Sequence, residues 1–391
     1  MLQELISRSP DLKQLQDEGY NLEIKSGYLL VKDVPYVNSK KEVKYGTLVS
    51  KLDLAGNITK KPDNHLVFFI GENPCESNGS PIEKIRHGSN RTTLAENIVV
   101  DHSFSAKPPT GYENYYHKMT TYIDIVAGRA QAIEPTITAK TFRAVSAMED
   151  ESVFKYIDTA SSRCEISTVT KKLELNKVAI VGLGGTGSYV LDLVAKAPVK
   201  EIHLFDGDKF LQHNAFRSPG APSIEELEEQ LHKTVYFQRI YSKMRRGVFS
   251  HPDYITAENV NQLEGMDFVF LCIDKGSVKK LVVEKLEELS IPFIDVGMGV
   301  QKTDDSLCGT LTVTTSTPTQ RKHFRSRVSF FDDDAKNEYN SNIQIADLNA
   351  LNAALAVIKW KKLFGFYHDL ENEHFFAYTV DGNHLMNEEK P

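Results

Sequence analysis

The sequence predicts an α/β protein in which a mixed α+β domain precedes a doubly wound, mostly parallel sheet. Three observations carry this prediction. Apolar runs of strand length recur beyond residue 176, each is followed by a helical pattern, and they lack the polar alternation of half-exposed strands. The first of these runs ends directly in a glycine-rich turn. With 391 residues the chain is long enough for two domains, which we place at residues 1–145 and 146–391.

The N-terminal domain is predicted to be a set of short strands followed by one long helix. The predicted elements are strands at 28–31, 65–70 and 98–102 and a helix over 112–132. A polar connecting region over 142–172 includes a short helical piece at 153–157. The triplet Asp101-His102-Ser103 invites a hydrolase interpretation, but a strand end before a proline turn is favoured. We expect this domain to bind a substrate or a partner enzyme.

The C-terminal domain alternates between strand and helix patterns. Its predicted strands are 178–181, 201–205, 254–257, 267–272, 292–296, 310–314 and 375–380. Its predicted helices are 188–196, 224–246, 279–289 and 345–358, the last of which ends near Gly365. Alanines lie between the apolar residues of that last helix. It is therefore expected to pack closely against the core or a dimer interface.

Composition and charge exclude several function classes. The formal net charge is −7, so no broad basic field exists to attract nucleic acid or an anionic membrane. Four cysteines, with no C-x-x-C pair among them, argue against a disulfide framework or a structural zinc site. A reducing cytoplasm is the simplest location. The sequence carries no secretory signal pattern and no apolar stretch of membrane-spanning length.

A glycine-rich turn joins the first strand of the C-terminal domain to its helix. Gly182, Gly184 and Gly187 satisfy the G-x-G-x-x-G spacing. The first glycine permits a sharp turn, the second lets the backbone approach a phosphate, and the third lets helix and strand pack closely. The helix N-terminus then offers N–H groups and a positive dipole end to an anion. Asp206, after the second strand, is placed to accept the ribose hydroxyls. The turn predicts nucleotide binding, with an NAD(P)-dependent oxidoreductase still among the candidates.

The residues beyond Asp206 separate these candidates. A D-x-D pair, an N-x-x-R pair, a lysine in the next helix and an aspartate after a later strand follow one another in order. With the double glycine, the full set is Gly184, Gly185, Asp206, Asp208, Asn214, Arg217, Lys233 and Asp274. This set resembles the superfamily that includes ThiF, MoeB and the ubiquitin-activating enzymes. The resemblance covers about residues 161–366.

The resemblance implies a Rossmann-like domain that adenylylates the C-terminal carboxylate of a ubiquitin-like or sulfur-carrier protein. ATP and magnesium are the implied cofactors. Arg217 and Lys233 would stabilise negative charge on the phosphates, and Asp274 would be the metal ligand. The residues implied to bind the nucleotide are Gly182, Gly184, Gly185, Gly187, Asp206, Asp208 and Asn214. An oxidoreductase would give Asn214, Arg217 and Lys233 no comparable role, and a non-catalytic nucleotide-binding scaffold is a third alternative.

The same resemblance implies partners. In the superfamily an arginine before the first strand can reach the ATP of a partner subunit, and Arg163 is the nearest candidate in this chain. A homodimer is therefore expected, together with the carrier protein and, as a further partner, a conjugating enzyme. ThiF-like domains fused to extra domains occur in bacterial ubiquitin-like conjugation operons, and the layout of this chain is similar.

The cysteines leave two mechanisms open. The stretch that corresponds to the crossover loop of the superfamily, residues 315–343, contains no cysteine. Either the enzyme passes the acyl group from AMP directly to a partner nucleophile, or Cys308 forms a thioester. We favour direct transfer, because Cys308 precedes a glycine and an apolar strand, as a small buried residue would. Cys272 lies in an apolar strand and is expected to be structural.

Overall fold

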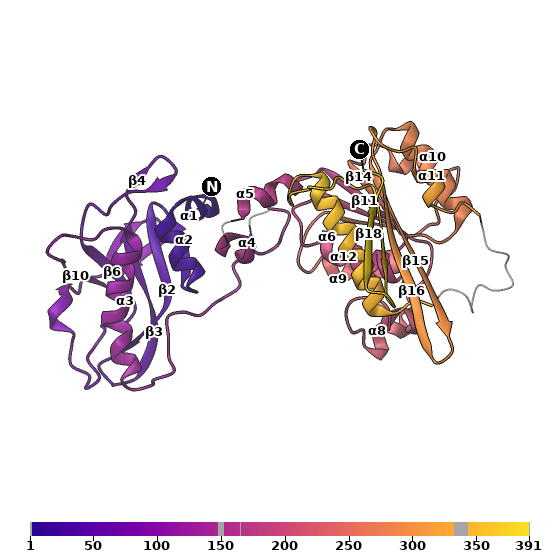
Figure 1. The fold of residues 1–391 in the computed structure, drawn as a ribbon. Helices are drawn as coiled ribbons and strands as arrows, with labels where there is room; N and C mark the ends of the chain where they lie inside the picture. The colour runs from indigo at the N-terminus through magenta and orange to yellow at the C-terminus, as the bar shows by residue number, and fades with distance from the viewer. Residues whose placement is uncertain (1, 148–151, 165, 332–342, 391) are drawn as a thin grey trace. The chain divides into compact units, whose positions relative to one another are not determined.

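The computed structural model describes residues 2–147, 152–164, 166–331 and 343–390, with no side chains described for residues 2–4, 162 and 163. Contacts divide the chain into two compact units, which are labelled by element in Figure 1. The first unit comprises Met1–Glu151 and Ile157–Cys164, and the second comprises Ser152–Tyr156 and Glu165–Pro391. Each unit has a hydrophobic core of its own.

The first unit is an antiparallel sheet with a long helix packed on it. Its helices are α1 (Leu2–Arg8), α2 (Pro10–Asp17), α3 (Tyr115–Gln131) and α4 (Thr159–Arg163). Its main strands are β1 (Asn21–Lys25), β2 (Tyr28–Val37), β3 (Val43–Lys51), β6 (Leu66–Ile70), β7 (Arg86–Gly88) and β10 (His102–Ser105). Two small hairpins pair β4 (Leu54–Ala55) with β5 (Ile58–Thr59) and β8 (Thr92–Ala95) with β9 (Ile98–Val100). The six main strands lie in the order β1-β2-β3-β6-β10-β7, and α3 buries Tyr115, Met119 and Tyr122 against them.

The second unit is built on an eight-stranded sheet. Its strands are β11 (Lys177–Val181), β12 (Glu201–Phe205), β13 (Val248–His251), β14 (Phe268–Leu271), β15 (Phe293–Thr303), β16 (Ser306–Ser316), β17 (Phe375–Thr379) and β18 (His384–Glu388). Its helices are α5 (Ser167–Thr170), α6 (Gly185–Val194), α7 (Gln212–Ala215), α8 (Ile224–Glu228), α9 (Lys233–Tyr241), α10 (Gly276–Glu288), α11 (Phe324–Arg327) and α12 (Ala346–Leu363). None of the described helices has the length and apolar character needed to cross a bilayer.

The order of the sheet confirms the predicted fold class. It runs β13-β12-β11-β14-β15-β16-β17-β18, with parallel pairing from β13 to β15 and antiparallel pairing beyond. Both faces are covered. Val178 and Ile180 of β11 pack in one core with residues of α6, α9 and α12, whereas Ala179 and Val181 pack in another with residues of α10 (Figure 1). This double burial explains why the central strands are apolar throughout.

The helix predicted over 224–246 is wrong, because the chain interrupts it. Residues 229–232 lie outside both α8 and α9. Gln230 has a φ of +44°, and the Leu231 carbonyl accepts a hydrogen bond from the N–H of Phe210. His232 forms a bridge with Lys209. Backbone pairing with the segment after β12 therefore overrides the helical pattern.

Two further local predictions are also wrong. Residues 254–257 are not a strand. The strand that pairs with β12 at the edge of the sheet is β13, in which Val248 pairs with Ile202 in parallel register. Residues 153–157 are not helical, and Phe154 instead forms an isolated bridge with Arg245. The predicted strands at 292–296 and 310–314 are the inner halves of a longer hairpin, β15–β16.

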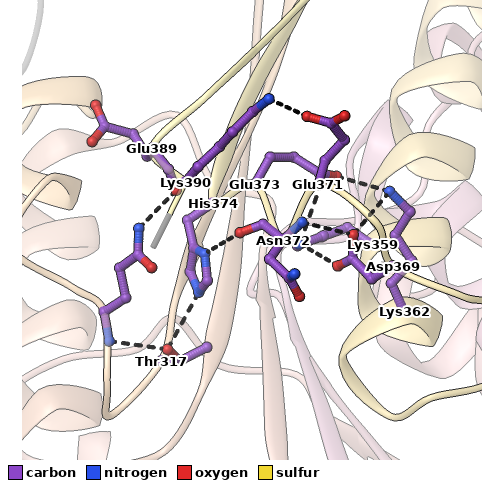
Figure 2. A network of polar contacts seen from close by, with 11 residues as sticks. Thr317, Lys359, Lys362, Asp369, Glu371, Asn372, Glu373, His374, Glu389 and Lys390 are labelled. Carbon is purple, nitrogen blue, oxygen red and sulfur yellow. Dashed lines mark hydrogen bonds and ion pairs between the residues drawn. The ribbon is translucent and has the colours of Figure 1, made fainter.

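A buried network of charges joins the end of α12 to the turn before β17 (Figure 2). The Lys359 Nζ lies 2.9 Å from the Asp369 carboxylate and 3.8 Å from that of Glu373. The Lys359 side chain is only 1% exposed. The next residue after Glu373, His374, places its Nε2 3.4 Å from the Thr317 Oγ1, at the end of β16. The network therefore fastens α12, β17 and the end of β16 to one another.

We expect Lys359→Met to destabilise the second unit by about 1.5–3 kcal/mol, because Asp369 and Glu373 would lose their buried cation and keep only Lys362 as an ionic partner. Lys196→Met is the matched control, since Lys196 forms an exposed ion pair with Asp192 on α6. That change is expected to cost less than about 1 kcal/mol. Chemical denaturation of both variants measures the difference. Equal stability of the two variants would show that the buried network contributes nothing specific.

Candidate active site

A cavity of about 310 Å³ lies where the parallel strands of the second unit end. Its walls come from the segments that follow β11, β12, β13 and β14, together with residues of β15 and α12. The carboxyl ends of neighbouring parallel strands meet at one edge of the sheet, and ligands of doubly wound folds bind there. Of the residues predicted for the site, those that line the cavity are Gly182, Gly184, Gly185, Asp206, Asp208, Arg217, Lys233 and Asp274.

The glycine turn is fixed by close backbone contacts. Gly182 has a φ of +90°, and a Cβ added to it would lie 2.4 Å from the Cys272 carbonyl oxygen. A Cβ on Gly187 would lie 1.9 Å from the carbonyl oxygen of Gly182. Only glycine permits both approaches. Gly187 therefore supports the turn from behind, whereas a Cβ on Gly184 would meet no atom within 4 Å and Gly184 faces the cavity.

Helix α6 begins at the cavity and presents its N-terminus there. Gly184, Gly185 and Thr186 line the wall, so the first N–H groups of the helix, which have no partner within it, are close to the cavity. Such a terminus favours an anion. Asn349 of α12 occupies the space that a Cβ of Gly185 would fill, at 2.1 Å. This explains the double glycine in terms of packing.

Asn349 is a site-supporting residue that the sequence prediction missed. It is fully buried, accepts a hydrogen bond from the Thr186 hydroxyl at 2.9 Å and donates to the Arg217 carbonyl at 3.3 Å. It thus connects the glycine turn to the loop that carries Arg217. One turn further along α12, Asn352 lines the cavity itself. Two asparagines among the apolar residues at 348–358 of this helix were the available signal.

Two carboxylates and one ammonium form the wall after β12. Asp206 accepts hydrogen bonds from the N–H groups of Leu183 at 2.7 Å and Asp208 at 2.8 Å. The Lys233 Nζ lies 2.7 Å from Asp208 and 3.5 Å from Asp206. Burial alone would raise the pKa of Asp208, but hydrogen bonds from Lys233 and Tyr254 hold it below its usual value. Lys233 is therefore a charged group positioned inside the cavity wall and not a solvated helix lysine.

Arg217 approaches the same cavity from the loop after α7. Its Nε is buried and, within the described residues, has no hydrogen-bond partner. Asn214 stabilises that loop through two hydrogen bonds. Its side chain accepts one from the N–H of Leu211 at 2.9 Å, and its backbone carbonyl accepts one from the N–H of Arg217 at 3.1 Å. A buried guanidinium nitrogen without an acceptor fits a site for an anion such as phosphate.

Asp274 is exposed in the cavity wall, three residues beyond the end of β14. Nearby, Lys279 pairs with Asp295 at 2.8 Å, and both side chains are buried. Among the described residues no cluster of three or more His, Cys, Asp or Glu side chains is arranged to hold a metal ion. Magnesium needs no such cluster, because it binds through one or two carboxylates and substrate phosphates. Asp274 fits that role.

The remaining predicted residues lie elsewhere or outside the described part of the chain. Arg163 ends α4, but its side chain is not described. Residues 332–342 of the stretch 315–343 also lie outside the described residues. Cys272 lines the cavity, and burial together with the charge of Asp295 raises the pKa of its thiol. Cys308 lies in the β15–β16 hairpin opposite Gln301.

Comparison with known proteins identifies two family matches. A family model described as a domain of unknown function (DUF6791) matches residues 10–159, and a model described as ThiF family matches residues 127–380, more than half of the chain. No curated protein matches the chain.

Among solved structures, Escherichia coli MccB with AMPCPP and MccA is 19% identical, with a TM-score of 0.47, over 60% of this chain and 72% of that chain. Escherichia coli MccB with succinimide is 19% identical, with a TM-score of 0.45, over 57% of this chain and 66% of that chain, just under two thirds of its length. PaaA is 16% identical, with a TM-score of 0.43, over 57% and 75%.

Substitution of two glycines by alanine is expected to separate folding from binding. Gly187→Ala should lower the free energy of unfolding by about 1–3 kcal/mol or more, because its methyl group would displace α6 from β11. Gly184→Ala should leave stability unchanged, since the added methyl group meets no atom within 4 Å. The same methyl group would stand in the cavity, so we expect weaker ATP binding. Thermal melts and calorimetric titration test both expectations; unchanged ATP affinity in Gly184→Ala would mean that no phosphate approaches this backbone.

Proposed function

The chain belongs to the ThiF family, and on that premise we propose that it adenylylates the C-terminal carboxylate of a ubiquitin-like or sulfur-carrier protein. ATP-dependent activation of a carboxylate is the activity that this membership supports in general terms. The observation that carries the proposal is the convergence of Arg217 and Lys233 on one cavity with the start of α6. Two fixed cations and a helix N-terminus suit a triphosphate better than a nicotinamide.

The proposed reaction is a displacement at the α-phosphorus of ATP. A carboxylate oxygen of the substrate forms a bond to that phosphorus, and the bond from phosphorus to the bridging oxygen of pyrophosphate breaks. The electron pair leaves with pyrophosphate, so the products are an acyl-adenylate and pyrophosphate. Negative charge accumulates on the phosphate oxygens as the displacement proceeds. Positioned cations in a half-enclosed cavity stabilise that charge more than the ground state.

Four residues of the cavity wall have a part in this proposal. Arg217 donates its unpartnered Nε and the rest of its guanidinium to phosphate oxygens. Lys233 adds an ammonium from the base of α9. Asp206 keeps acceptor capacity for a ribose hydroxyl, since each carboxylate oxygen accepts more than one hydrogen bond. Asp274 would hold magnesium, whose role is to neutralise phosphate charge and orient the leaving group.

The partners follow from the same proposal. The carrier protein presents its C-terminal carboxylate, and the first unit binds the carrier or a conjugating enzyme. We also propose a homodimer in the cytoplasm, in which Arg163 contributes to the ATP site of the partner subunit. The family assignment supports the chemistry, whereas these partners extend it.

Loss of a charged group from the cavity wall is expected to reduce activity without unfolding the protein. Arg217→Ala and Lys233→Ala should each lower kcat/KM for ATP–pyrophosphate exchange by about 10²–10³-fold, by analogy with the removal of a transition-state donor. Asp274→Asn should abolish exchange. Arg239→Ala is the matched control, because Arg239 lies on α9, pairs with Glu226 and Glu229, and is not part of the cavity wall. Effects of only a few-fold would favour a nucleotide-binding scaffold, and NAD(P)H binding would favour an oxidoreductase.

Cys308→Ala is expected to retain full activity. Cys308 lies in the outer half of the β15–β16 hairpin, where its Sγ is 3.3 Å from the Thr303 hydroxyl, and it is not part of the cavity wall. A thiol at that place is poorly positioned to attack the adenylate. The assay is a non-reducing gel with ATP, magnesium and the carrier protein, with Cys164→Ala run in parallel. A thiol-sensitive enzyme–carrier band lost only in Cys308→Ala would contradict direct transfer.

A further inference from the structure

Tyr254 is an exposed aromatic residue in the wall of the cavity that is proposed to bind ATP. It follows β13, and 62% of the residue is accessible to solvent. Its ring lies on the backbone of Gly207, where an added Cβ would come within 2.9 Å of three ring atoms. Gly207 is thus the residue that allows the ring to lie flat against the segment between Asp206 and Asp208. The ring is held in place even though one face is open.

The hydroxyl of Tyr254 begins a chain of hydrogen bonds that ends at the glycine turn. It donates to one oxygen of Asp208, and the other oxygen of Asp208 accepts from the Lys233 Nζ at 2.7 Å. Lys233 also lies 3.5 Å from Asp206, which accepts from the N–H of Leu183 at 2.7 Å. The chain therefore connects the segment after β13 to the end of β12, the start of α9 and the turn before α6.

Lys233 depends on this chain more than a surface lysine would. Its side chain is 7% exposed, so its ammonium needs nearby hydrogen-bond acceptors in place of water, and these acceptors fix its orientation. Asp208 is its closer carboxylate, but the Asp208 side chain is 51% exposed and can rotate into solvent. The Tyr254 hydroxyl occupies one oxygen of that carboxylate and leaves the other directed at Lys233. The hydrogen bond also raises the pKa of Tyr254 to about 12, so the hydroxyl stays a donor at neutral pH.

We propose that Tyr254 is a positioning residue for nucleotide binding, which acts through Asp208 to hold the Lys233 ammonium against the phosphates. The inference rests on the proposed function, because it assumes that the cavity takes ATP. Tyr254 itself does not need to touch a phosphate for this role. Its effect is confined to the part of the ligand that Lys233 contacts.

Binding of ATP and of adenosine by Tyr254→Phe tests the proposal without any carrier protein. The variant keeps the ring on Gly207 and removes only the hydroxyl. We expect its Kd for ATP to rise about fivefold to tenfold, as for loss of a hydrogen bond to a charged group. Its Kd for adenosine should stay within about twofold, because adenosine carries no phosphate. Equal loss for both ligands would overturn the proposal and would mean that the tyrosine contacts the nucleoside directly.

A double-mutant cycle supplies the second measurement. In a Lys233→Ala background, Tyr254→Phe should cause no further loss of ATP affinity, because the group that it positions is absent. Additive losses would overturn the proposal. Tyr241→Phe is the matched control, since the Tyr241 hydroxyl donates to Asp192 at 3.0 Å and neither residue lines the cavity.

The outcomes distinguish the inference from the proposed function. Wild-type protein that binds no ATP would overturn both. Wild-type protein that binds ATP, with Tyr254→Phe binding it equally well, would overturn the positioning role alone.

Discussion

The close approach of α6 to the ends of β11 and β14 is the constraint on which the rest of the cavity depends. Neither Gly182 nor Gly187 has a side chain, so the helix can begin directly against the sheet. This contact places the first turn of α6 at the edge where the strands end. It also brings the N–H of Leu183 to Asp206, which in turn fixes the corner that Asp208 and Lys233 share. If an added methyl group pushed α6 away from the sheet, the N–H of Leu183 would move first, and Asp206, Asp208 and Lys233 would shift with it.

The sequence was sufficient to predict this part of the molecule because its physics is local. A glycine turn, the strand before it and the helix after it are neighbours in the chain, and Asp206 follows at a spacing that the fold determines. The roles of Tyr254 and Asn349 were not predicted, because they depend on contacts between residues far apart in the sequence. Tyr254 reaches Asp208 across 46 residues, and Asn349 reaches Thr186 across 163. The break at residues 229–232 escaped for the same reason, since it follows from pairing with Lys209 and Phe210.

The buried charges of the second unit are of two kinds: those that are paired within the fold and those that line the cavity. Lys279 is paired with Asp295, and Lys359 with Asp369 and Glu373, so these ammonium groups are compensated within the fold. Lys233 is compensated by two aspartates but lies in the cavity wall. In the part of the chain that the structure describes, the buried Nε of Arg217 has no acceptor at all. An anionic ligand in the cavity would supply an acceptor for this guanidinium.

The end of the β15–β16 hairpin is expected to open more easily than the central strands of the sheet. β15 pairs with β14 only over Phe293–Asp295, whereas its pairing with β16 continues to Thr303 and Ser306. Residues 301–307 are exposed, so the end of the hairpin is a two-stranded ribbon with little apolar burial. Isolated ribbons of this kind are marginally stable. Its amide hydrogens can therefore exchange with solvent through local fraying, whereas those of β11 and β14 require the whole core to open.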